Sequence, residues 1–442
     1  LKDDALKLKE FIKKYVRYGD NGETLYLINE GRIQPSKALA DALASMLKGN
    51  NEFVLIDEQK LVFETARDLA RKSQNRKKQV LIVDGGPGTG KSVVAINLLV
   101  DFFHRAGLNA RYVTKNAAPR AVYESKLTGT LTKTRISNLF TGSGTFTDTK
   151  TNTFDVLLVD EAHRLNEKSG MFQNIGENQI KEIIEASKLS VFFIDEDQRV
   201  TFKDIGEKTQ IEGWAKKCGA EVQELRLESQ FRCNGADGYL AWLDHILGIR
   251  NTVNTTLEGV DYEFQVVDSP NELRKIIEKK NKANNKARMV AGYCWDWVSK
   301  KDPERMDIVI PEHSFEAKWN LAADGSLWIL KPESVSEVGC IHTCQGLELD
   351  YIGVIIGRDL MINGGEVHTY PELRAKTDKS LHGYKALFKK NPTEAKCKAD
   401  LIIKNTYRTL MTRGQRGCIV YATDVQTNRY LKERASQKLR LF

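Results

Sequence analysis

Short apolar runs alternate with amphipathic or polar segments along much of this 442-residue chain. Short runs bounded by polar residues are typical of buried strands, and the longer segments between them have the apolar spacing of helices. Strands that alternate with helices favour a parallel sheet with crossover connections. The first series of runs is Val80–Val83, Arg111–Thr114, Val156–Val159 and Val191–Ile194.

A second series of runs begins beyond residue 260 and predicts a second α/β domain. We therefore expect two tandem domains, at residues 51–225 and 226–442, after a small helical segment at residues 1–50. Residues 361–400 are rich in Lys, Gly and His and are expected to form an exposed insertion in the second domain. The second series is Phe264–Val267, Met289–Tyr293, Asp307–Ile310, Leu327–Leu330, Tyr351–Ile356 and Ile419–Ala422.

The sequence GGPGTGKS, residues 85–92, joins the first predicted strand to the helical segment after it. It satisfies the pattern G-x-x-x-x-G-K-[S/T] in the strand–loop–helix context that the pattern requires. Backbone N–H groups of such a loop point at phosphates, and the helix N-terminus adds the positive end of its dipole. We expect Lys91 at the β- and γ-phosphates of ATP and Ser92 on Mg²⁺. The residues predicted to bind the nucleotide here are Gly85, Gly86, Pro87, Gly88, Thr89, Gly90, Lys91 and Ser92.

Polar side chains follow the third and fourth runs. The segment VLLVDEAHR ends a predicted strand with two carboxylates, Asp160 and Glu161. Parallel sheets present their ligands at the carboxyl ends of strands, so we expect Asp160 on Mg²⁺ and Glu161 beside the attacking water. The next run, VFFIDEDQR, is followed by Gln198, whose neutral amide can sense the γ-phosphate without competing for the metal.

Three more side chains are candidates for the nucleotide site. Gln59, in FVLIDEQKLVF, lies upstream of the phosphate loop, where a side-chain amide can pair with the adenine edge. Arg232, in LESQFRCN, and Arg413, in NTYRTLMTRGQRG, belong to the second domain. Arginines supplied across a cleft stabilise the charge that develops on a transferred phosphoryl group. Such residues make hydrolysis depend on closing of the two domains.

The overall composition narrows the class of protein. The 67 basic and 59 acidic residues give a net charge of +8, which favours a polyanionic partner only weakly because the charges are mixed. Seven cysteines, an odd and scattered number, are typical of reduced thiols in the cytoplasm. The sequence contains no run of 18 or more apolar residues, so we expect no membrane partner. Oligomeric state has no signal in the sequence.

Weaker patterns leave alternatives open. Cys340, His342 and Cys344 occupy alternate positions of an apparent strand, but zinc needs about four ligands and no second pair lies nearby. The Lys-rich stretch at residues 372–404 fits either a phosphate backbone or a solvated helix. Four tryptophans between residues 295 and 328 fit core packing better than stacking on bases. Asp307, Glu316 and Lys318 loosely match the D…E-x-K pattern of a metal-dependent nuclease.

The ordered motifs resemble those of superfamily 1 helicase-type ATPases. They are Gln59, GGPGTGKS, YVTKNA at 112–117, VDEAH at 159–163, FIDEDQ at 193–198, SQFRC at 229–233, IHTCQGLELD at 341–350 and TYRTLMTRG at 406–414. Four segments also resemble a bacterial family of helicase-like ATPases akin to the helicase portion of Schlafen proteins. These are EGRIQPSKALADAL, AGYCWDW, GCIHTCQGLELDYIGVIIG and IIKNTYRTLMTRG.

The resemblance implies a role for each matching residue. It implies two RecA-like P-loop NTPase domains, with Gln59 reading adenine, Glu161 as general base and Gln198 as γ-phosphate sensor. Arg232 and Arg413 would be arginine fingers. Within the motif IHTCQGLELD, Gln345, Gly346 and Glu348 match the family pattern, and Glu348 would approach the ribose. The residues that would contact the nucleic-acid backbone are Thr114, Lys115, Asn116, His342 and Thr343.

Two departures from the superfamily pattern affect the expected activity. Only about forty residues separate YVTKNA from VDEAH, so no domain-sized strand-separating wedge fits between them. The residues before Gln198 are Ile194, Asp195, Glu196 and Asp197, where the family usually has a Gly-Asp pair. We therefore expect translocation without strong unwinding. We also expect the coupling segment to be altered in the motif FIDEDQ at residues 193–198.

Three functions are compared. The leading one is an ATP-dependent motor on single-stranded nucleic acid, with DNA favoured over RNA. The second is a nucleotide-gated switch that controls an effector domain or protein partner in antiviral defence against phage. It is favoured by the Schlafen resemblance and by the start of the chain at Leu1 rather than Met, from which we expect a missing N-terminal part. The third is a nuclease.

Overall fold

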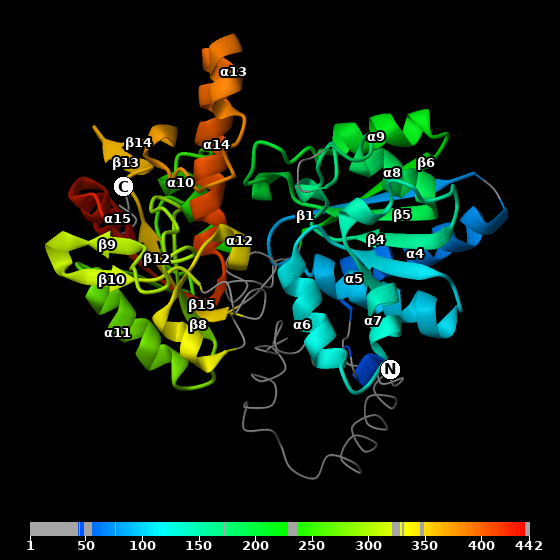
Figure 1. Ribbon diagram of the computed structural model, residues 1–442, viewed down its shortest axis with the longest axis horizontal. Helices are drawn as coiled ribbons and strands as arrows, with labels where there is room; N and C mark the ends of the chain where they lie inside the picture. Colours follow the sequence, from blue (N-terminus) through cyan, green and yellow to red (C-terminus); the bar gives the residue numbers. More distant parts are fainter. Residues whose placement is uncertain are drawn as a thin grey trace, which may run out of the picture.

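The computed structural model describes residues 43, 45–47, 55–75, 77–170, 174–228, 237–320, 328, 331–344 and 349–437. Most of the predicted helical segment at residues 1–50 lies outside them. Two α/β units lie side by side in Figure 1, the first in blue to green and the second in green to red. Each is built on its own parallel sheet. None of the helices in these ranges is long and apolar enough to span a membrane.

The first sheet has six parallel strands in the order β3-β2-β4-β5-β1-β6. The strands are β1 (Gln79–Gly85), β2 (Ala110–Val113), β3 (Phe140–Thr141), β4 (Phe154–Val159), β5 (Ser187–Ile194) and β6 (Glu221–Leu227). The helices are α4 (Asp57–Asn75), α5 (Lys91–Val100), α6 (Ala117–Leu127), α7 (Lys133–Leu139), α8 (Gln179–Ala186) and α9 (Lys208–Lys217). β6 was not predicted, and it ends two residues beyond the predicted domain boundary at 225.

Side chains alternate across the first sheet as the strand period requires. Leu81 and Val83 of β1 pack on one face with α4 and α5, while Val80 and Ile82 pack on the other with α8 and α9. Both faces are therefore buried, which explains why the strands read as continuous apolar runs rather than as alternating ones. The predicted α/β class is confirmed, with the phosphate loop at the carboxyl end of a central strand.

The second sheet has five parallel strands in the order β11-β8-β12-β15-β7. They are β7 (Glu263–Val266), β8 (Ala287–Ala291), β11 (Val338–Gly339), β12 (Leu349–Ile356) and β15 (Gly414–Ala422). Its helices are α10 (Asp237–Ile246), α11 (Pro270–Asn281), α12 (Ile341–Cys344), α13 (Tyr384–Lys390), α14 (Pro392–Met411) and α15 (Val425–Ser436). Two antiparallel pairs complete the domain: β9 (Ile308–Ile310) with β10 (Phe315–Ala317), and β13 (Leu360–Asn363) with β14 (Glu366–Thr369).

Several sequence-based expectations in the second domain were wrong. The apparent strand through Cys340 and His342 is a short helix, because the Thr343 hydroxyl accepts from the Cys340 N–H at 2.8 Å and caps the turn. The run at residues 307–310 pairs with β10 rather than joining the main sheet. The long helix α14 begins at Pro392, where Asn391 accepts from the Glu394 N–H.

Helix α14 lies on the side of the second domain that faces the first (Figure 1). Its Asn405 side chain donates from Nδ2 to the Arg199 carbonyl of the first domain at 3.2 Å. A second link joins the Phe202 N–H to the Ser380 carbonyl at 2.8 Å. The loop that follows Gln198 in the first domain is thus attached to the second domain at two points.

Candidate nucleotide and nucleic-acid site

The phosphate loop runs between the end of β1 at Gly85 and the start of α5 at Lys91. Gly88 and Gly90 both have φ of +84°, a conformation that side chains disfavour. At Gly90 a Cβ would also lie 2.2 Å from Nε2 of Gln59 and would displace that amide from its place against the loop. The loop is closed by Thr89, whose hydroxyl donates to the Gly86 carbonyl at 3.1 Å. The positive φ at position 90 therefore favours glycine, and a side chain there would also disturb the contact of Gln59 with the loop.

Gln59 lies against this loop from the first turn of α4. Its Nε2 donates to the Thr89 carbonyl at 3.1 Å, and the side chain is buried. The structure brings Gln59 to the phosphate loop although thirty positions separate it from Thr89. Its predicted contact with adenine stays a prediction.

Lys91 lies over the loop that precedes it. Its Nζ donates to the carbonyls of Gly85, at 2.5 Å, and Gly86, at 2.7 Å. The same Nζ lies 3.9 Å from Oδ2 of Asp195, at the end of the neighbouring strand β5. An ammonium group at this position can move from loop carbonyls to phosphate oxygens with a small rotation of its side chain.

The two predicted magnesium ligands are in contact. The Ser92 hydroxyl donates to Oδ2 of Asp160 at 2.7 Å, and the Tyr112 hydroxyl donates to the same oxygen. Oδ1 of Asp160 accepts from the Glu161 N–H at 2.9 Å. Burial, and then the charge of Asp160, raises the pKa of Tyr112 well above its ordinary value, so the phenol stays a donor. A hydroxyl and a carboxylate fit Mg²⁺, which takes its remaining oxygens from phosphates and water.

Glu161 has an unusual backbone. Its φ of +52° and ψ of +45° place a non-glycine residue in the left-handed region, directly after the last residue of the β4 ladder and Asp160. Such conformations are sparsely populated and cluster at functional sites, where surrounding structure holds them. The conformation gives Glu161 a direction different from that of Asp160, so that the two adjacent carboxylates can serve different partners.

Gln198 connects the two domains. Its Nε2 donates to Oδ2 of Asp195 at 2.6 Å, and its Oε1 accepts from Nη2 of Arg413 at 3.2 Å. Both Gln198 and Arg413 are buried. A continuous chain of polar contacts therefore runs from Lys91 through Asp195 and Gln198 to Arg413 in the second domain.

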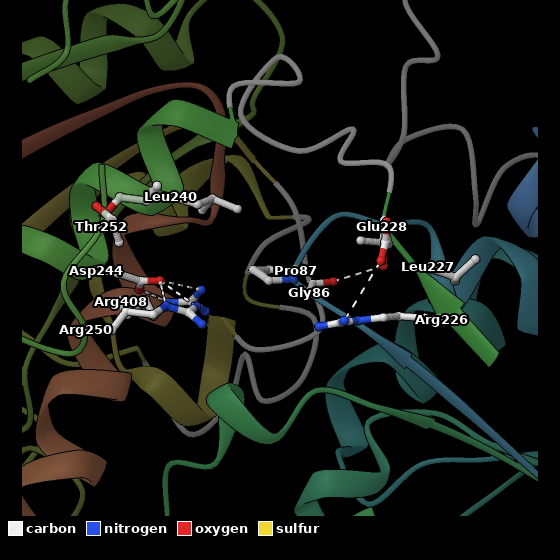
Figure 2. Close-up of a pocket in the computed structure, with 12 residues that line it drawn as sticks. Gly86, Pro87, Arg226, Leu227, Glu228, Leu240, Asp244, Arg250, Thr252 and Arg408 are labelled. Carbon is white, nitrogen blue, oxygen red and sulfur yellow. Dashed lines mark hydrogen bonds and ion pairs between the residues drawn. The ribbon is translucent and has the colours of Figure 1, made fainter. Parts of the chain in front are cut away.

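A cavity of about 370 Å³ lies between the phosphate loop and the second domain. Figure 2 shows Gly86 and Pro87 on one wall and Asp244, Arg250 and Arg408 gathered opposite them. This volume lies within the range of small-molecule sites. The remaining lining residues are Thr89, Arg226, Leu227, Glu228, Leu240, Ala241 and Thr252.

Asp244 holds two guanidinium groups at this wall. Its Oδ1 accepts from Nε of Arg408 at 2.5 Å, and its Oδ2 lies 2.6 Å from Nη2 of Arg250. Arg250 also reaches Oδ2 of Asp197 in the first domain at 3.1 Å. Burial disfavours the charge of Arg408, but Asp244, with Asp195 beyond it, outweighs burial and raises the pKa above its ordinary value. Arg408 therefore stays protonated at the cavity wall.

Sequence reasoning missed these three residues. Arg408 lies within the quoted motif TYRTLMTRG, so its presence in that motif was a usable signal. Asp244 and Arg250 carry no local signal, because their significance arises only from contacts with α14 and with the first domain.

The predicted nucleic-acid residues of the first domain already have partners. Thr114 is buried, and Asn116 caps α6 by accepting from the Ala118 N–H at 3.2 Å. Nζ of Lys115 lies 3.2 Å from Oδ1 of Asp204. Burial lowers the pKa of Lys115 to about 8, against the opposing charge of Asp204. Their contact with nucleic acid stays a prediction.

His342 and Thr343 of α12 lie at one end of a buried network. Nε2 of His342 is 3.8 Å from Oδ1 of Asp378, and Arg374 pairs with both Asp378, at 3.2 Å, and Asp359, at 3.3 Å. Asp359 then accepts from the hydroxyl of Tyr407, which lies on α14 next to Arg408. The network thus joins a predicted nucleic-acid contact to the helix that lines the nucleotide cavity.

Residues 78–424 match the family model described as Schlafen group 3, DNA/RNA helicase domain. The chain belongs to this family. The predicted resemblance to the helicase portion of Schlafen proteins is confirmed. The family identifies the chain as a helicase-like NTPase, and its two α/β domains are each built on a parallel sheet.

The Schlafen-type helicase domain has relatives among other proteins. The uncharacterized protein YPL245W of Saccharomyces cerevisiae is 26% identical over 300 residues, 61% of this chain and 63% of the yeast protein. This chain therefore spans less than two thirds of that relative. The crystal structure of Pif1 helicase from Candida albicans is 10% identical, with a TM-score of 0.36 over 87% of this chain and 98% of that one.

A further solved structure, the arterivirus nonstructural protein 10 (helicase) with DNA, is 11% identical, with a TM-score of 0.32. It covers 84% of this chain and 65% of that one.

Some predicted residues of the Schlafen-type site lie outside the described ranges. These are Arg232, Gln345, Gly346 and Glu348. Asp307, the first residue of the nuclease-like pattern, lies within the described ranges and has a structural role there. Both oxygens of Asp307 accept hydrogen bonds from Ser299, and Oδ2 accepts another from the Trp319 N–H. The described residues hold no group of three or more His, Cys, Asp or Glu side chains suited to a metal.

Proposed function

We propose that this Schlafen-type domain hydrolyses ATP between its two domains and uses the cycle to move along single-stranded nucleic acid, DNA in preference to RNA. The observation that carries the proposal is the chain of contacts from Lys91 to Arg413 through Gln198. A γ-phosphate beside Lys91 would meet an amide already bonded to the second domain. Loss of that phosphate would change the bond, and with it the position of α14.

Ser92 and Asp160 would hold Mg²⁺, which when bound supplies positive charge that offsets the charge of the phosphates. Glu161, aimed away from Asp160 by its left-handed backbone, would accept the proton of the attacking water. Lys91 would exchange its loop carbonyls for phosphate oxygens. Each of these three roles uses a different atom of a preformed cluster, so no large rearrangement within the first domain is needed.

Arg413 and Arg408 would supply charge from the second domain. Arg408 and Arg250 line the cavity opposite Gly86, and Asp244 keeps both in place. Guanidinium groups positioned across a cleft stabilise a transferring phosphoryl group by roughly 10³- to 10⁵-fold in rate. Closing of the domains would bring these charges to the phosphates, so hydrolysis would depend on closure.

The network from His342 to Tyr407 supports coupling to a strand. A nucleic acid that contacts His342 would act on Asp378, Arg374 and Asp359 in turn, and these residues fix Tyr407 on α14. Free thiols at Cys218, Cys294, Cys340, Cys397 and Cys418 support the proposed cytoplasmic location.

The direct test is steady-state ATP hydrolysis by the whole chain with and without single-stranded DNA and RNA, with Lys91→Ala as the blank. Single-stranded DNA should stimulate the rate more than RNA does. Glu161→Gln should abolish hydrolysis but retain nucleotide binding, because the amide cannot accept the proton. Glu167→Gln, at an exposed position six residues away, is the matched control and should leave the rate unchanged. Full activity of Glu161→Gln would contradict the assignment.

A second candidate is a nucleotide-gated switch that controls an effector domain or partner, as proposed for antiviral defence. It is favoured by the small size of the segment between β2 and β4. This segment contains α6, α7 and the two-residue strand β3, and is too small for a strand-separating wedge domain. Directional displacement of a strand or of a bound roadblock by this chain alone would reject the switch. Hydrolysis that neither nucleic acid stimulates would favour it.

A further inference from the structure

Helix α13 and the first turns of α14 carry a concentrated positive charge. Residues 384–398, named here the basic helix pair, contain five lysines and one acidic residue, Glu394. All five lysines are exposed. They are Lys385, Lys389, Lys390, Lys396 and Lys398.

Core packing does not explain α13, the first helix of the basic helix pair. No residue of α13 is buried, and Figure 1 shows α13 and the adjoining part of α14 projecting past the rest of the second domain, away from its sheet. A surface helix of a globular domain normally buries one apolar face. A short helix that buries nothing and carries several like charges has no evident structural role in this domain.

Aromatic rings lie among the lysines. The ring of Phe388 is 37% exposed and lies 5.7 Å from the ring of Tyr384, and Nζ of Lys396 lies 5.9 Å from the centre of the Phe388 ring. Proteins that bind unpaired strands combine cations that follow the backbone with aromatic rings on which bases stack. The basic helix pair has both components on one projecting surface.

The base of the pair is fixed to the nucleotide-sensing part of the first domain. The Tyr384 ring packs edge-on against Phe202 at 6.1 Å, and the Phe202 N–H donates to the Ser380 carbonyl at 2.8 Å. Phe202 lies four residues after Gln198, in the loop that α14 also contacts through Asn405. A strand held on the basic helix pair would therefore act directly on the loop that follows Gln198.

We propose that the basic helix pair binds the phosphate backbone of single-stranded nucleic acid, with Phe388 as a stacking surface for a base. This surface is separate from the predicted contacts at Lys115 and His342, and it rests on the proposed function as a motor on a single strand. The five lysines attract the strand and the ring engages an unpaired base. Contact with Phe202 passes the presence of the strand to Gln198 and so raises the rate of hydrolysis.

The strength of binding should follow the number of lysines at phosphates. For single strands, the logarithm of the affinity falls with the logarithm of salt concentration with a slope of about −0.7 per neutralised phosphate. Removal of five lysines that contact phosphates would therefore reduce the magnitude of the slope by about 3.5. Replacement of an aromatic ring should weaken binding without changing the slope, because stacking releases no counterions.

The test uses the whole chain and fluorescent 20-nucleotide poly-dT and poly-U strands, with affinity measured by anisotropy between 50 and 200 mM NaCl. One variant converts the five lysines of the pair to Gln. The control variant converts five exposed lysines on α4, α9 and α11 to Gln, and so has the same net charge. Its substitutions are Lys60→Gln, Lys72→Gln, Lys216→Gln, Lys275→Gln and Lys279→Gln.

The helix-pair variant should lose at least about 30-fold in affinity at 50 mM salt, and the magnitude of its salt slope should fall by about 3.5, while the control changes little. Phe388→Ala should lose about 5-fold with the slope retained. Hydrolysis without nucleic acid should be unchanged in the helix-pair variant, and its stimulation should be lost. That unchanged basal rate also shows that the variant is folded.

Other outcomes overturn the proposal in distinguishable ways. Equal affinity and slope in the two lysine variants would reject the helix pair alone and leave the proposed motor intact. Failure of the unmodified chain to bind either strand would reject both. A third outcome is that the helix-pair variant loses binding to anionic phosphatidylserine vesicles as strongly as it loses binding to the strand, while Phe388→Ala does not affect strand binding. The surface would then bind polyanions in general, and the proposal would also be rejected.

Discussion

Gln198 is a side chain of the first domain that contacts both the nucleotide site and the second domain. Its amide nitrogen binds Asp195 and its amide oxygen binds Arg413, so both ends of one flat group are in use. Substitution at either end of the Gln198–Arg413 bond should interrupt the same event. The two residues should therefore act as a unit in catalysis.

Arg413→Ala should lower kcat roughly 100-fold or more, because a charge that stabilises the transferring phosphoryl group is lost. Gln198→Ala should lower kcat as well, and the double variant should be little worse than Arg413→Ala. Nucleotide affinity, measured with a fluorescent ATP analogue, should change less than kcat. Gln210→Ala, at an exposed position on α9, is the control. Losses that simply multiply in the double variant would show that the two residues act independently.

Lys115 gives nucleic-acid binding a dependence on pH. Burial lowers its pKa from 10.5 to about 8, so its charge disappears between pH 7 and pH 9, while ordinary lysines keep theirs. If Lys115 contacts the strand, affinity should fall over this interval. The fall should be absent in Lys115→Arg, whose guanidinium stays charged. A fall of equal size in both proteins would remove Lys115 from the interface.

The same shift has a defined effect on stability. Between pH 8 and pH 10.5 the unfolded chain holds a proton at Lys115 that the folded chain has released. Stability contributed by this group therefore rises with pH over that interval and is lowest below pH 8.

At the scale of elements, α14 carries second-domain residues that contact the nucleotide cavity, the first domain and the network from α12. Tyr407 receives the network from α12, Arg408 faces the cavity, and Asn405 holds the loop of the first domain. Asp244 of α10 fixes the helix in place through Arg408. Geometry at the nucleotide cavity therefore depends on how firmly α10 and α14 are joined.

Asp244→Ala should lower the free energy of unfolding by roughly 3–5 kcal/mol, because it leaves the buried Arg408 without its partner. Urea unfolding measures the effect. Asp268→Ala, which removes a largely exposed partner of Lys432, is the control and should change stability little. Asp244→Ala combined with Arg408→Met should recover part of the loss. A stability equal to that of the control would contradict the importance of this pair.

A glycine sets the distance between β8 and α14. A Cβ at Gly292 would lie 1.9 Å from the Tyr407 hydroxyl, which is fully buried and accepts from the Gly357 N–H at 2.9 Å. Gly292→Ala should lower the free energy of unfolding by roughly 1–3 kcal/mol through overpacking. Gly213→Ala in α9, where the added Cβ meets no atom, should raise it by up to about 1 kcal/mol. Thermal melting of both variants distinguishes these signs.

The strands and the phosphate loop could be predicted because their signals are local. Val80–Val83 is buried on both faces and reads as apolar throughout, and the loop residues follow it directly. The helix at Ile341–Cys344 was misread because four residues give no period and its capping hydroxyl is inside the element. Asp244 could not be found, since Arg408 lies 164 positions away and Arg250 in an irregular segment.

For the whole molecule, the two domains contribute different steps. All six strands of the first sheet lie between Gln79 and Leu227, and the phosphate loop and both predicted magnesium ligands lie within the same span. The charges expected to act on the phosphate, Arg408 and Arg413, lie in the other domain. Nucleotide binding and hydrolysis should therefore be separable by dividing the chain.

A fragment of residues 1–228 should fold and bind ATP with Mg²⁺ but hydrolyse it at least about 10³-fold more slowly than the whole chain. Calorimetric titration with a non-hydrolysable analogue measures binding, and Lys91→Ala in the same fragment is the blank. Hydrolysis by the fragment at the rate of the whole chain would show that the second domain supplies no catalytic charge.

The order of the two domains along the chain also sets a timetable for synthesis. Arg413 lies 215 positions after Gln198, and Asn405 lies 206 after Arg199, so the cleft closes only after α14 and Arg413 have been made. At about 5–20 residues per second, the first domain would be complete for roughly 10–40 s before α14 leaves the ribosome. During that interval a nascent chain would hold ATP without consuming it. Each molecule would therefore already have ATP bound when its second domain folds. Its first round of ATP hydrolysis would follow completion of the fold.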